Sequence, residues 1–349
     1  MSQNKLHAAQ TDLPDKGKLQ INVTSTLGFF PVTDAKVTIT LSEAPDTIIE
    51  ELDTNISGQT AEIELPAPPL DYSLEPGAAQ PYADYDITVK APGYESVVIE
   101  KVQILPEVEA IQPVSMTPEE VETAPEEDIL TLPHTLYGEY PPKIEEDEIK
   151  PMDDDGEIVL SRVVVPETVV VHDGVPDDST AKNYYVPYRD YIKNVASSEI
   201  YATWPEQAIY ANILAIMSFT LNRVYTEWYR NKGYNFTITS STAYDQKWMR
   251  GRNVFSNISY LVDSIFTSYL SRPGVRQPIF TSYCNGSTVT CNGLSQWGSK
   301  YLGDQGYSAI EIIRYYYGSD MYINTATSVS GVPSSWPGYN LSIGARGDK

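Results

Sequence analysis

The chain has 349 residues, of which 41% are hydrophobic and 20% are charged, and its formal net charge at pH 7 is −23. This length allows two or three domains, and the hydrophobic content excludes a chain that is disordered throughout. No run of about 18 apolar residues occurs, so the sequence predicts no transmembrane helix and no membrane insertion. The first residues also lack the apolar segment of a Sec signal peptide.

Charge and tyrosine content divide the chain into two different halves. Residues 1–180 contain 37 acidic and 9 basic residues, whereas residues 181–349 contain 10 acidic and 15 basic residues and 20 of the 26 tyrosines. Such an asymmetry indicates two separate tasks. The acidic half argues against nucleic acid as a partner of the whole chain. The basic half suits an anionic polymer, although ordinary surface variation explains its charge equally well.

The first part of the chain has a β pattern. Residues 1–16 form a polar tail, and residues 17–117 alternate apolar and polar residues in runs such as "KLQINVTS", "AKVTITLSE", "YDITVKAPGY" and "SVVIEKVQIL". Turn-forming residues separate these runs, which predicts an all-β sandwich of short antiparallel strands. This region resembles the carboxypeptidase-regulatory-like, transthyretin-type module, and the resemblance implies an adaptor or spacer. The region contains no catalytic constellation.

Residues 118–180 are rich in Glu, Asp and Pro. Repulsion between like charges and the lack of an apolar period predict an extended linker. The segment "EIVLSRVVVPETVVVHDG" near its end predicts one or two short strands, which could pair with the neighbouring domain.

Helices alternate with a few strands in residues 181–349, which predicts an α+β domain. A first helix is expected at about 188–198. A longer helix is expected from "TWPE", with Thr203 as N-cap and Glu206 closing a capping box. A strand in "NFTITSS", a helix in "NVFSNISYLVDSIFTSYL" and a strand in "PIFTSYC" follow. The segments "SQWGSKYLGDQG" and "SAIEIIRYYYG" predict two final helices.

All three histidines lie in the first half, at positions 7, 134 and 172. Ser-His-Asp and Cys-His hydrolases need an imidazole base, so residues 181–349 cannot contain either site. The commonest zinc ligand is also missing there.

Four segments, in order, resemble the SpoIID/LytB family, the stage II sporulation protein D-like domain, over about residues 184–320. They are "VPYRDYIKNVASSEIYATWPEQAIYANILAIMSFTLNR", "TSSTAYDQKW", "IFTSYCNGST" and "GLSQWGSKYLGDQGYSAIEIIRYYYG". The resemblance implies a peptidoglycan lytic transglycosylase that cleaves the β-1,4 bond between N-acetylmuramic acid and N-acetylglucosamine. It also implies that Glu199, in Ser197-Ser198-Glu199, is the catalytic acid.

A single carboxylate can perform this chemistry. The leaving oxygen needs a proton while positive charge develops at the anomeric carbon. If the 6-hydroxyl of the sugar attacks in place of water, the same Glu acts first as acid and then as base. Burial against Tyr191, Tyr201 and Trp204 would raise the pKa of Glu199 and keep it protonated. The alternative is that Glu199 only caps or solvates the end of a helix.

Other residues are candidates for binding the substrate. The resemblance places them in or beside the glycan groove, with Trp297 stacking on a sugar face. They are Ser198, Tyr201, Asp245, Gln246, Ser282, Tyr283, Ser295, Gln296 and Trp297. The competing interpretations are a hydrogen-bonded loop pair for Asp245 and Gln246 and a core anchor for Trp297. Two positions depart from the family pattern, because Met217 replaces its usual Arg and Thr290 its usual His, and both changes bear on activity.

Cys284 and Cys291 leave three alternatives open. The Asn-Gly turn signal in "CNGSTVTC" suits a disulfide across a hairpin, and free thiols are equally compatible with the sequence. A zinc site is the third alternative, because some family members hold a metal near this strand. Asp, Glu or water would then have to complete the ligand set. We expect no other cofactor.

The expected partner of the C-terminal domain is a peptidoglycan glycan strand at the bacterial cell wall. Since no Sec signal peptide is evident, delivery on a phage tail or a phage-tail-like contractile particle is the expected route, with the N-terminal half contacting other subunits. The alternative function is a non-catalytic glycan-binding or structural baseplate protein with a degenerate SpoIID-like domain.

Overall fold

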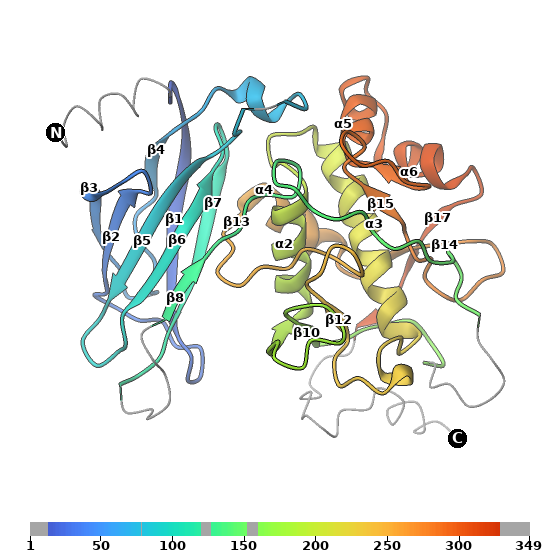
Figure 1. Ribbon diagram of the computed structural model, residues 1–349, viewed down its shortest axis with the longest axis horizontal. Helices are drawn as coiled ribbons and strands as arrows, with labels where there is room; N and C mark the ends of the chain where they lie inside the picture. The colour runs from blue at the N-terminus through green and yellow to red at the C-terminus, as the bar shows by residue number, and fades with distance from the viewer. Residues whose placement is uncertain (1–12, 78, 120–126, 152–159, 329–349) are drawn as a thin grey trace. The chain divides into compact units, whose positions relative to one another are not determined.

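The computed structural model describes residues 13–77, 79–119, 127–151 and 160–328 (Figure 1). Two compact units divide the chain. The first comprises Met1–Gly138, Tyr201–Thr203 and Met249–Ser259, and the second comprises Glu139–Ile200, Trp204–Trp248 and Tyr260–Lys349. The expected polar tail lies outside the described residues up to position 12, and its last two residues already belong to the first strand.

Two sheets form the first unit. One has the strand order β13-β7-β1-β4 and the other the order β3-β2-β5-β6-β8. Most neighbouring strands are antiparallel, but β1 runs parallel to β7 and β6 runs parallel to β8. The strands are β1 (Asp15–Ser25), β2 (Lys36–Leu41), β3 (Ala44–Asp53), β4 (Ile63–Ala67), β5 (Ala83–Lys90), β6 (Val97–Ile104), β7 (Glu109–Met116), β8 (Glu127–Leu130) and β13 (Val254–Phe255), with a 3-10 turn at Leu70–Ser73.

Alternation along these strands produces the core of the first unit. In β1, Leu19, Ile21 and Val23 are fully buried while the residues between them are more exposed. Strands β2 and β5 alternate in the same way. Because successive side chains in a strand point to opposite faces, each sheet buries one face, as a β-sandwich requires. The four runs quoted above for residues 17–117 contain strands β1, β2, β5 and β6, so the sequence predicted the β-rich character of this region correctly.

The second unit combines helices with short strands. Its main sheet has the order β11-β10-β12, and three two-stranded pairs join β14 with β17, β15 with β16, and β9 with β18. The helices are α2 (Tyr188–Glu199), α3 (Glu206–Tyr225), α4 (Ser256–Ile265, which begins in the first unit), α5 (Gln296–Asp304) and α6 (Ala309–Tyr317), with a 3-10 turn at Arg230–Lys232. The strands are β9 (Val164–Val165), β10 (Thr168–His172), β11 (Asn183–Pro187), β12 (Ile238–Thr239), β14 (Ser268–Ser271), β15 (Tyr283–Cys284), β16 (Leu294–Ser295), β17 (Tyr322–Thr325) and β18 (Thr327–Ser328).

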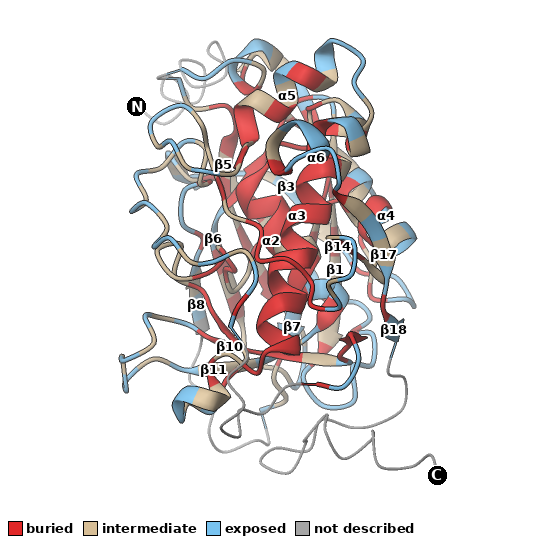
Figure 2. Cartoon of the chain, turned by 90° about the vertical axis from the view of Figure 1, so that its right-hand side faces the viewer, coloured by how far each residue is buried: buried red, intermediate tan, exposed pale blue. Residues whose placement is uncertain are grey.

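Helix α3 is the centre of the second unit. Nearly all of its residues are buried, and it contacts α2, α5, α6 and β14 (Figure 2). A helix that is apolar on all sides is expected to be enclosed by other elements. Its start differs from the prediction, because Pro205 is the N-cap and no side chain caps the helix. The expected Thr203–Glu206 capping box is therefore wrong, whereas the corresponding Ser308–Glu311 box is present at the start of α6.

The acidic segment is more than a linker. Its β8 pairs with β6, and β10 pairs with β11 and β12 of the second unit. Between them, residues 139–150 run without regular secondary structure and bond to the rest of the second unit. We call residues 139–150 the strap. Within the described ranges, no helix is both long enough and apolar enough to cross a bilayer.

Candidate functional site

Glu199 is the last residue of α2 and is only 3% exposed. Both of its carboxylate oxygens accept hydrogen bonds. The backbone N–H of Lys247 donates to Oε1 at 2.7 Å, and the hydroxyl of Tyr283 donates to Oε2 at 2.6 Å. The side chain of Gln296 fixes the end of the helix, since its Nε2 donates to the Glu199 carbonyl at 3.1 Å. Glu199 is therefore held in one position and is not a solvated helix end.

Gln246 links Glu199 to the core through Tyr283. Its Nε2 donates to the Tyr283 hydroxyl at 3.1 Å and to the Ile216 carbonyl at 3.0 Å. Its Oε1 accepts bonds from the hydroxyls of Thr220 at 2.8 Å and Tyr191 at 3.1 Å. A buried amide with all of these partners has one orientation, so the Tyr283 hydroxyl is oriented to donate to Glu199.

Asp245 belongs to a neighbouring buried ion cluster. Its Oδ1 accepts a bond from Nε of Arg223 at 2.7 Å, and its Oδ2 accepts bonds from Tyr229 at 2.6 Å and from Thr239. The outer edge of the Arg223 guanidinium makes a bidentate ion pair with Glu146 of the strap, with Nη1 donating at 2.8 Å and Nη2 at 2.6 Å. Every acceptor site of Asp245 is thus directed at protein groups, which suits a structural anchor.

Burial raises the pKa of Glu199, and three neighbours oppose this effect: the charge of Lys143, the backbone N–H of Lys247 and the hydroxyl of Tyr283. Burial also raises the pKa of Tyr283 well above its ordinary value, with the Glu199 charge adding to the shift. Tyr283 therefore stays a neutral donor. A carboxyl group with a raised pKa beside a fixed hydroxyl has the properties of a general acid.

The other two candidates next to Glu199 in sequence have contacts of their own. The hydroxyl of Ser198 donates back to the Asn194 carbonyl at 2.9 Å. Tyr201 belongs to the first unit, where its ring packs on His134 at 4.4 Å between centroids. The sequence could not show this, because the division of the chain into units falls between Ile200 and Tyr201.

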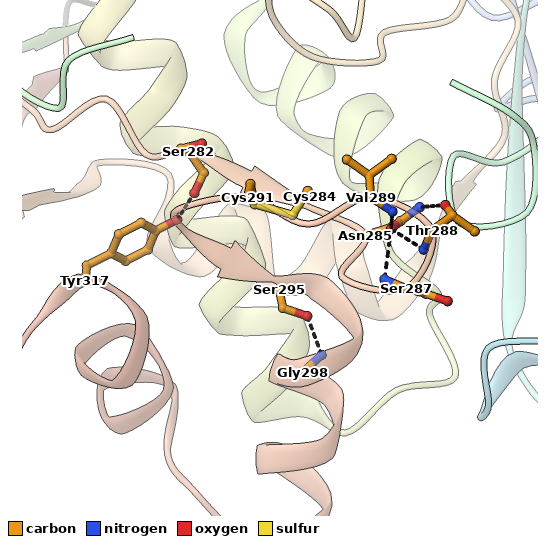
Figure 3. The surroundings of a disulfide bond; sticks show 10 residues. All are labelled: Ser282, Cys284, Asn285, Ser287, Thr288, Val289, Cys291, Ser295, Gly298 and Tyr317. Carbon is orange, nitrogen blue, oxygen red and sulfur yellow. Dashed lines mark hydrogen bonds between the residues drawn. A yellow bond between two sulfur atoms is a disulfide. The ribbon is translucent and has the colours of Figure 1, made fainter. Parts of the chain in front are cut away.

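The candidates near the last helix pair mostly have structural contacts. Ser295 caps α5 by accepting the Gly298 N–H at 2.9 Å, and the carbonyl of Ser282 accepts a bond from Tyr317 at 2.8 Å (Figure 3). Trp297 is only 8% exposed and its ring packs against Trp204 at 4.9 Å. This is the position of a core anchor.

Cys284 and Cys291 form a disulfide, with a Cα–Cα distance of 6.1 Å (Figure 3). The zinc alternative for these cysteines is wrong, because both sulfurs are bonded to each other. The expected hairpin is also wrong, since β15 and β16 run parallel. The Asn285–Gly286 turn is present: Asn285 Oδ1 accepts three backbone N–H bonds, and Gly286 has a φ of 75°. Across the described ranges, no group of three or more His, Cys, Asp or Glu side chains is arranged to hold a metal ion.

Sequence reasoning missed Lys143 and Arg223. Arg223 had a readable signal, because an Arg inside an apolar helix needs a carboxylate partner. Lys143 had none, since it stands in an acidic, proline-rich stretch. Lys143 is half-buried, and burial lowers the pKa of its ammonium. The ammonium donates to the carbonyl of Asp245 and lies 4.9 Å from the ring centroid of Phe219 and 5.1 Å from that of Tyr283.

Comparisons with known proteins establish no family for this chain. No protein-family profile and no curated protein matches it. Structural similarities are weak. The TIE protein of Bacillus anthracis has a TM-score of 0.22 at 14% identity, over 30% of this chain and 17% of that protein. The minor pilin GBS52 of Streptococcus agalactiae has a TM-score of 0.22 at 13% identity, over 32% of this chain and 49% of that protein. Klebsiella pneumoniae 5-hydroxyisourate hydrolase has a TM-score of 0.20 at 13% identity, over 29% of this chain and 90% of that protein.

Proposed function

We propose that the chain is a peptidoglycan lytic transglycosylase in which Glu199 is the only acid/base. The observation that carries the proposal is the buried Glu199 carboxyl group, whose pKa is raised by burial and whose Oε2 accepts the fixed Tyr283 hydroxyl. The resemblance of residues 184–320 to the SpoIID/LytB family supports the same residue.

The proposed reaction uses Glu199 twice. The protonated carboxyl group donates its proton to the glycosidic oxygen as the bond to the anomeric carbon breaks. The resulting carboxylate then takes the proton of the sugar 6-hydroxyl as that oxygen attacks the anomeric carbon, which forms a 1,6-anhydro end. Tyr283 orients the carboxyl group, and Gln246 orients Tyr283.

The test is incubation with purified sacculi and with peptide-free glycan strands, followed by mass spectrometry of the products. We expect 1,6-anhydro ends from the wild-type protein and none from Glu199→Gln. Glu227→Gln is a matched control, because Glu227 is also a buried glutamate of the second unit whose burial raises its pKa. Reducing ends would indicate a hydrolase instead.

A second candidate is a glycan-binding or structural module that does not cut. The observation in its favour is that Glu199 is closed off, with both oxygens occupied and only 3% exposure. Binding to sacculi that Glu199→Gln leaves unchanged, without cleavage by the wild-type protein, would support this candidate.

The setting we propose is the bacterial cell wall, reached on a phage tail or tail-like particle through the acidic N-terminal half. The disulfide supports an oxidising setting. Recovery of the chain with purified extracellular particles would support this route, whereas recovery only as a freely secreted monomer would contradict it.

A further inference from the structure

The strap is attached to the second unit along its length. The N–H of Ile144 donates to the Ala243 carbonyl at 2.7 Å, the carbonyl of Glu148 accepts the Phe280 N–H at 2.8 Å, and the N–H of Lys150 donates to Gln277 at 2.7 Å. The Glu146–Arg223 ion pair adds a buried attachment. The Glu148–Arg272 ion pair is a further attachment. Because the strap contains no helix or strand, its departure would break these bonds without unpairing a sheet or unwinding a helix.

The strap contacts the two groups that hold the Glu199 carboxylate. The Lys143 ammonium lies over the ring of Tyr283, whose hydroxyl donates to Glu199. The side-chain ammonium of Lys247 lies 5.5 Å from the ring centroid of Tyr140. The backbone N–H of the same lysine donates to Glu199. The strap therefore contacts both residues that donate hydrogen bonds to the Glu199 carboxylate, Tyr283 and Lys247.

Charge adds a second argument. Without the strap, the buried ionisable side chains of this cluster are Glu199, Asp245 and Arg223. The strap adds Lys143, Lys150 and Glu146 to the same cluster. Burial lowers the pKa of both lysines, to about 8 for Lys150. The charge of Lys143 also opposes the rise in the pKa of Glu199, so the docked strap disfavours the protonated form that a general acid needs.

We propose that residues 139–150 are an autoinhibitory strap, with Lys143 occupying the approach to Glu199, and that the strap must leave before a glycan strand can reach this carboxyl group. The inference rests on the proposed function, since it assigns the regulation of the same site. Departure of the strap has two effects: it uncovers Glu199, and it removes the cation that favours the carboxylate.

The test measures access to Glu199 without any glycan. The full chain is treated with a water-soluble carbodiimide and glycine methyl ester, and modification of each carboxyl group is quantified by mass spectrometry. We expect Glu199 to be protected in the wild-type protein and its modification to rise about tenfold in Lys143→Ala, as removal of a closed state raises apparent access. Lys300→Ala is the matched control, because it removes a lysine of the second unit that pairs with Asp304 on α5.

A reversible lock tests the movement itself. Ile144→Cys and Ala243→Cys are added to Lys143→Ala, because the bond between these residues places their backbones side by side. Oxidation should return Glu199 to wild-type protection, and a reductant should restore its modification. Lys143→Ala without the new cysteines controls for reduction of the native disulfide. Urea unfolding of each variant shows whether it is folded.

The outcomes separate the two proposals. Equal protection of Glu199 in the wild-type and Lys143→Ala proteins would overturn the strap proposal. Continued modification of Glu199 after oxidation of the variant with Ile144→Cys and Ala243→Cys would also overturn it. If modification follows the expectation but no variant cleaves glycan strands, the strap stands and the transglycosylase proposal fails. If cleavage occurs at the same rate with the strap locked, the site is open by another path and the strap proposal is wrong.

Discussion

At the scale of single residues, Glu199 combines two demands that conflict in water. A general acid must be protonated near neutral pH, and it must be held in one orientation. Burial at the end of α2 serves the first demand, and the bonds from Lys247 and Tyr283 serve the second. Because those bonds also stabilise the carboxylate, each donor lowers the pKa of Glu199 and opposes the effect of burial.

Replacing Tyr283 with Phe removes one of these donors. We expect cleavage of glycan strands to fall about 10- to 100-fold, since an unoriented acid loses part of its catalytic contribution. The pKa of Glu199 should rise further, moving the alkaline limb of the rate profile to higher pH. Tyr317→Phe is the matched control, because its hydroxyl bonds to the Ser282 carbonyl instead. An unchanged rate profile in Tyr283→Phe would contradict the orienting role.

The raised pKa of Glu199 also has a consequence for stability. A carboxyl group whose pKa is raised by folding stabilises the protein fully below its ordinary value of 4.5, and this stability is lost as pH rises through the folded pKa. Glu199→Gln should therefore gain stability relative to the wild-type protein as pH increases above about 4.5. Urea unfolding at a series of pH values measures this difference.

Glu311→Gln is the control with the opposite sign. The bonds from Ser308 lower the pKa of Glu311, so its stabilising effect is present above its ordinary pKa and is lost in acid. The Gln variant should lose stability relative to the wild-type protein as pH rises. Parallel trends for the two variants would mean that folding does not raise the pKa of Glu199.

At the scale of elements, the short strands of the second unit form few ladder hydrogen bonds, so other contacts must hold them in place. Strands β15 and β16 pair over only two residues each, and this pair carries Tyr283 and Ser295. The Cys284–Cys291 disulfide and the turn at Asn285 hold the loop between them. Gly286 is required in this turn, because a Cβ there would lie 1.8 Å from Oγ of Ser295. The loop thus fixes the strand that presents Tyr283.

Removing the disulfide measures this contribution. Cys284→Ser with Cys291→Ser should lower the free energy of unfolding by about 2 kcal/mol, as expected for a crosslink that closes a short loop. A reductant should lower the stability of the wild-type protein by the same amount and leave the double variant unchanged. Sensitivity of the double variant to reductant would assign the effect to another cause.

At the scale of the whole molecule, each unit is assembled from separate parts of the chain. Residues 249–259 belong to the first unit, where β13 pairs with β7, although they follow α3 of the second unit in sequence. The second unit includes the strap, which its buried ion cluster attaches through Glu146. Arg223 is shared by Glu146 and Asp245, and so it joins the strap to the loop after β12.

Arg223→Met tests this connection. We expect a loss of about 3–5 kcal/mol in the free energy of unfolding, because two buried carboxylates lose their shared counter-charge. Adding Glu146→Gln should recover part of the loss by removing one of those charges. Lys300→Met, which breaks an exposed pair within α5, should cost less than about 1 kcal/mol. A similar small loss for Arg223→Met would show that the cluster does not hold the strap.

The sequence by itself located most of the regular elements, although the single helix that it predicted over residues 253–270 is β13, α4 and β14 in the structure. Alternation located the strands of the first unit, and the apolar period located α2 and the enclosed helix α3, because local periodicity reflects which side of an element is buried. It also singled out Glu199, Gln246 and Tyr283, which the structure brings together. Only the tertiary structure decided which groups surround the carboxylate. Lys143 lies 56 positions before Glu199 in a stretch without periodicity, and contacts of that kind depend on how distant segments meet rather than on any local pattern.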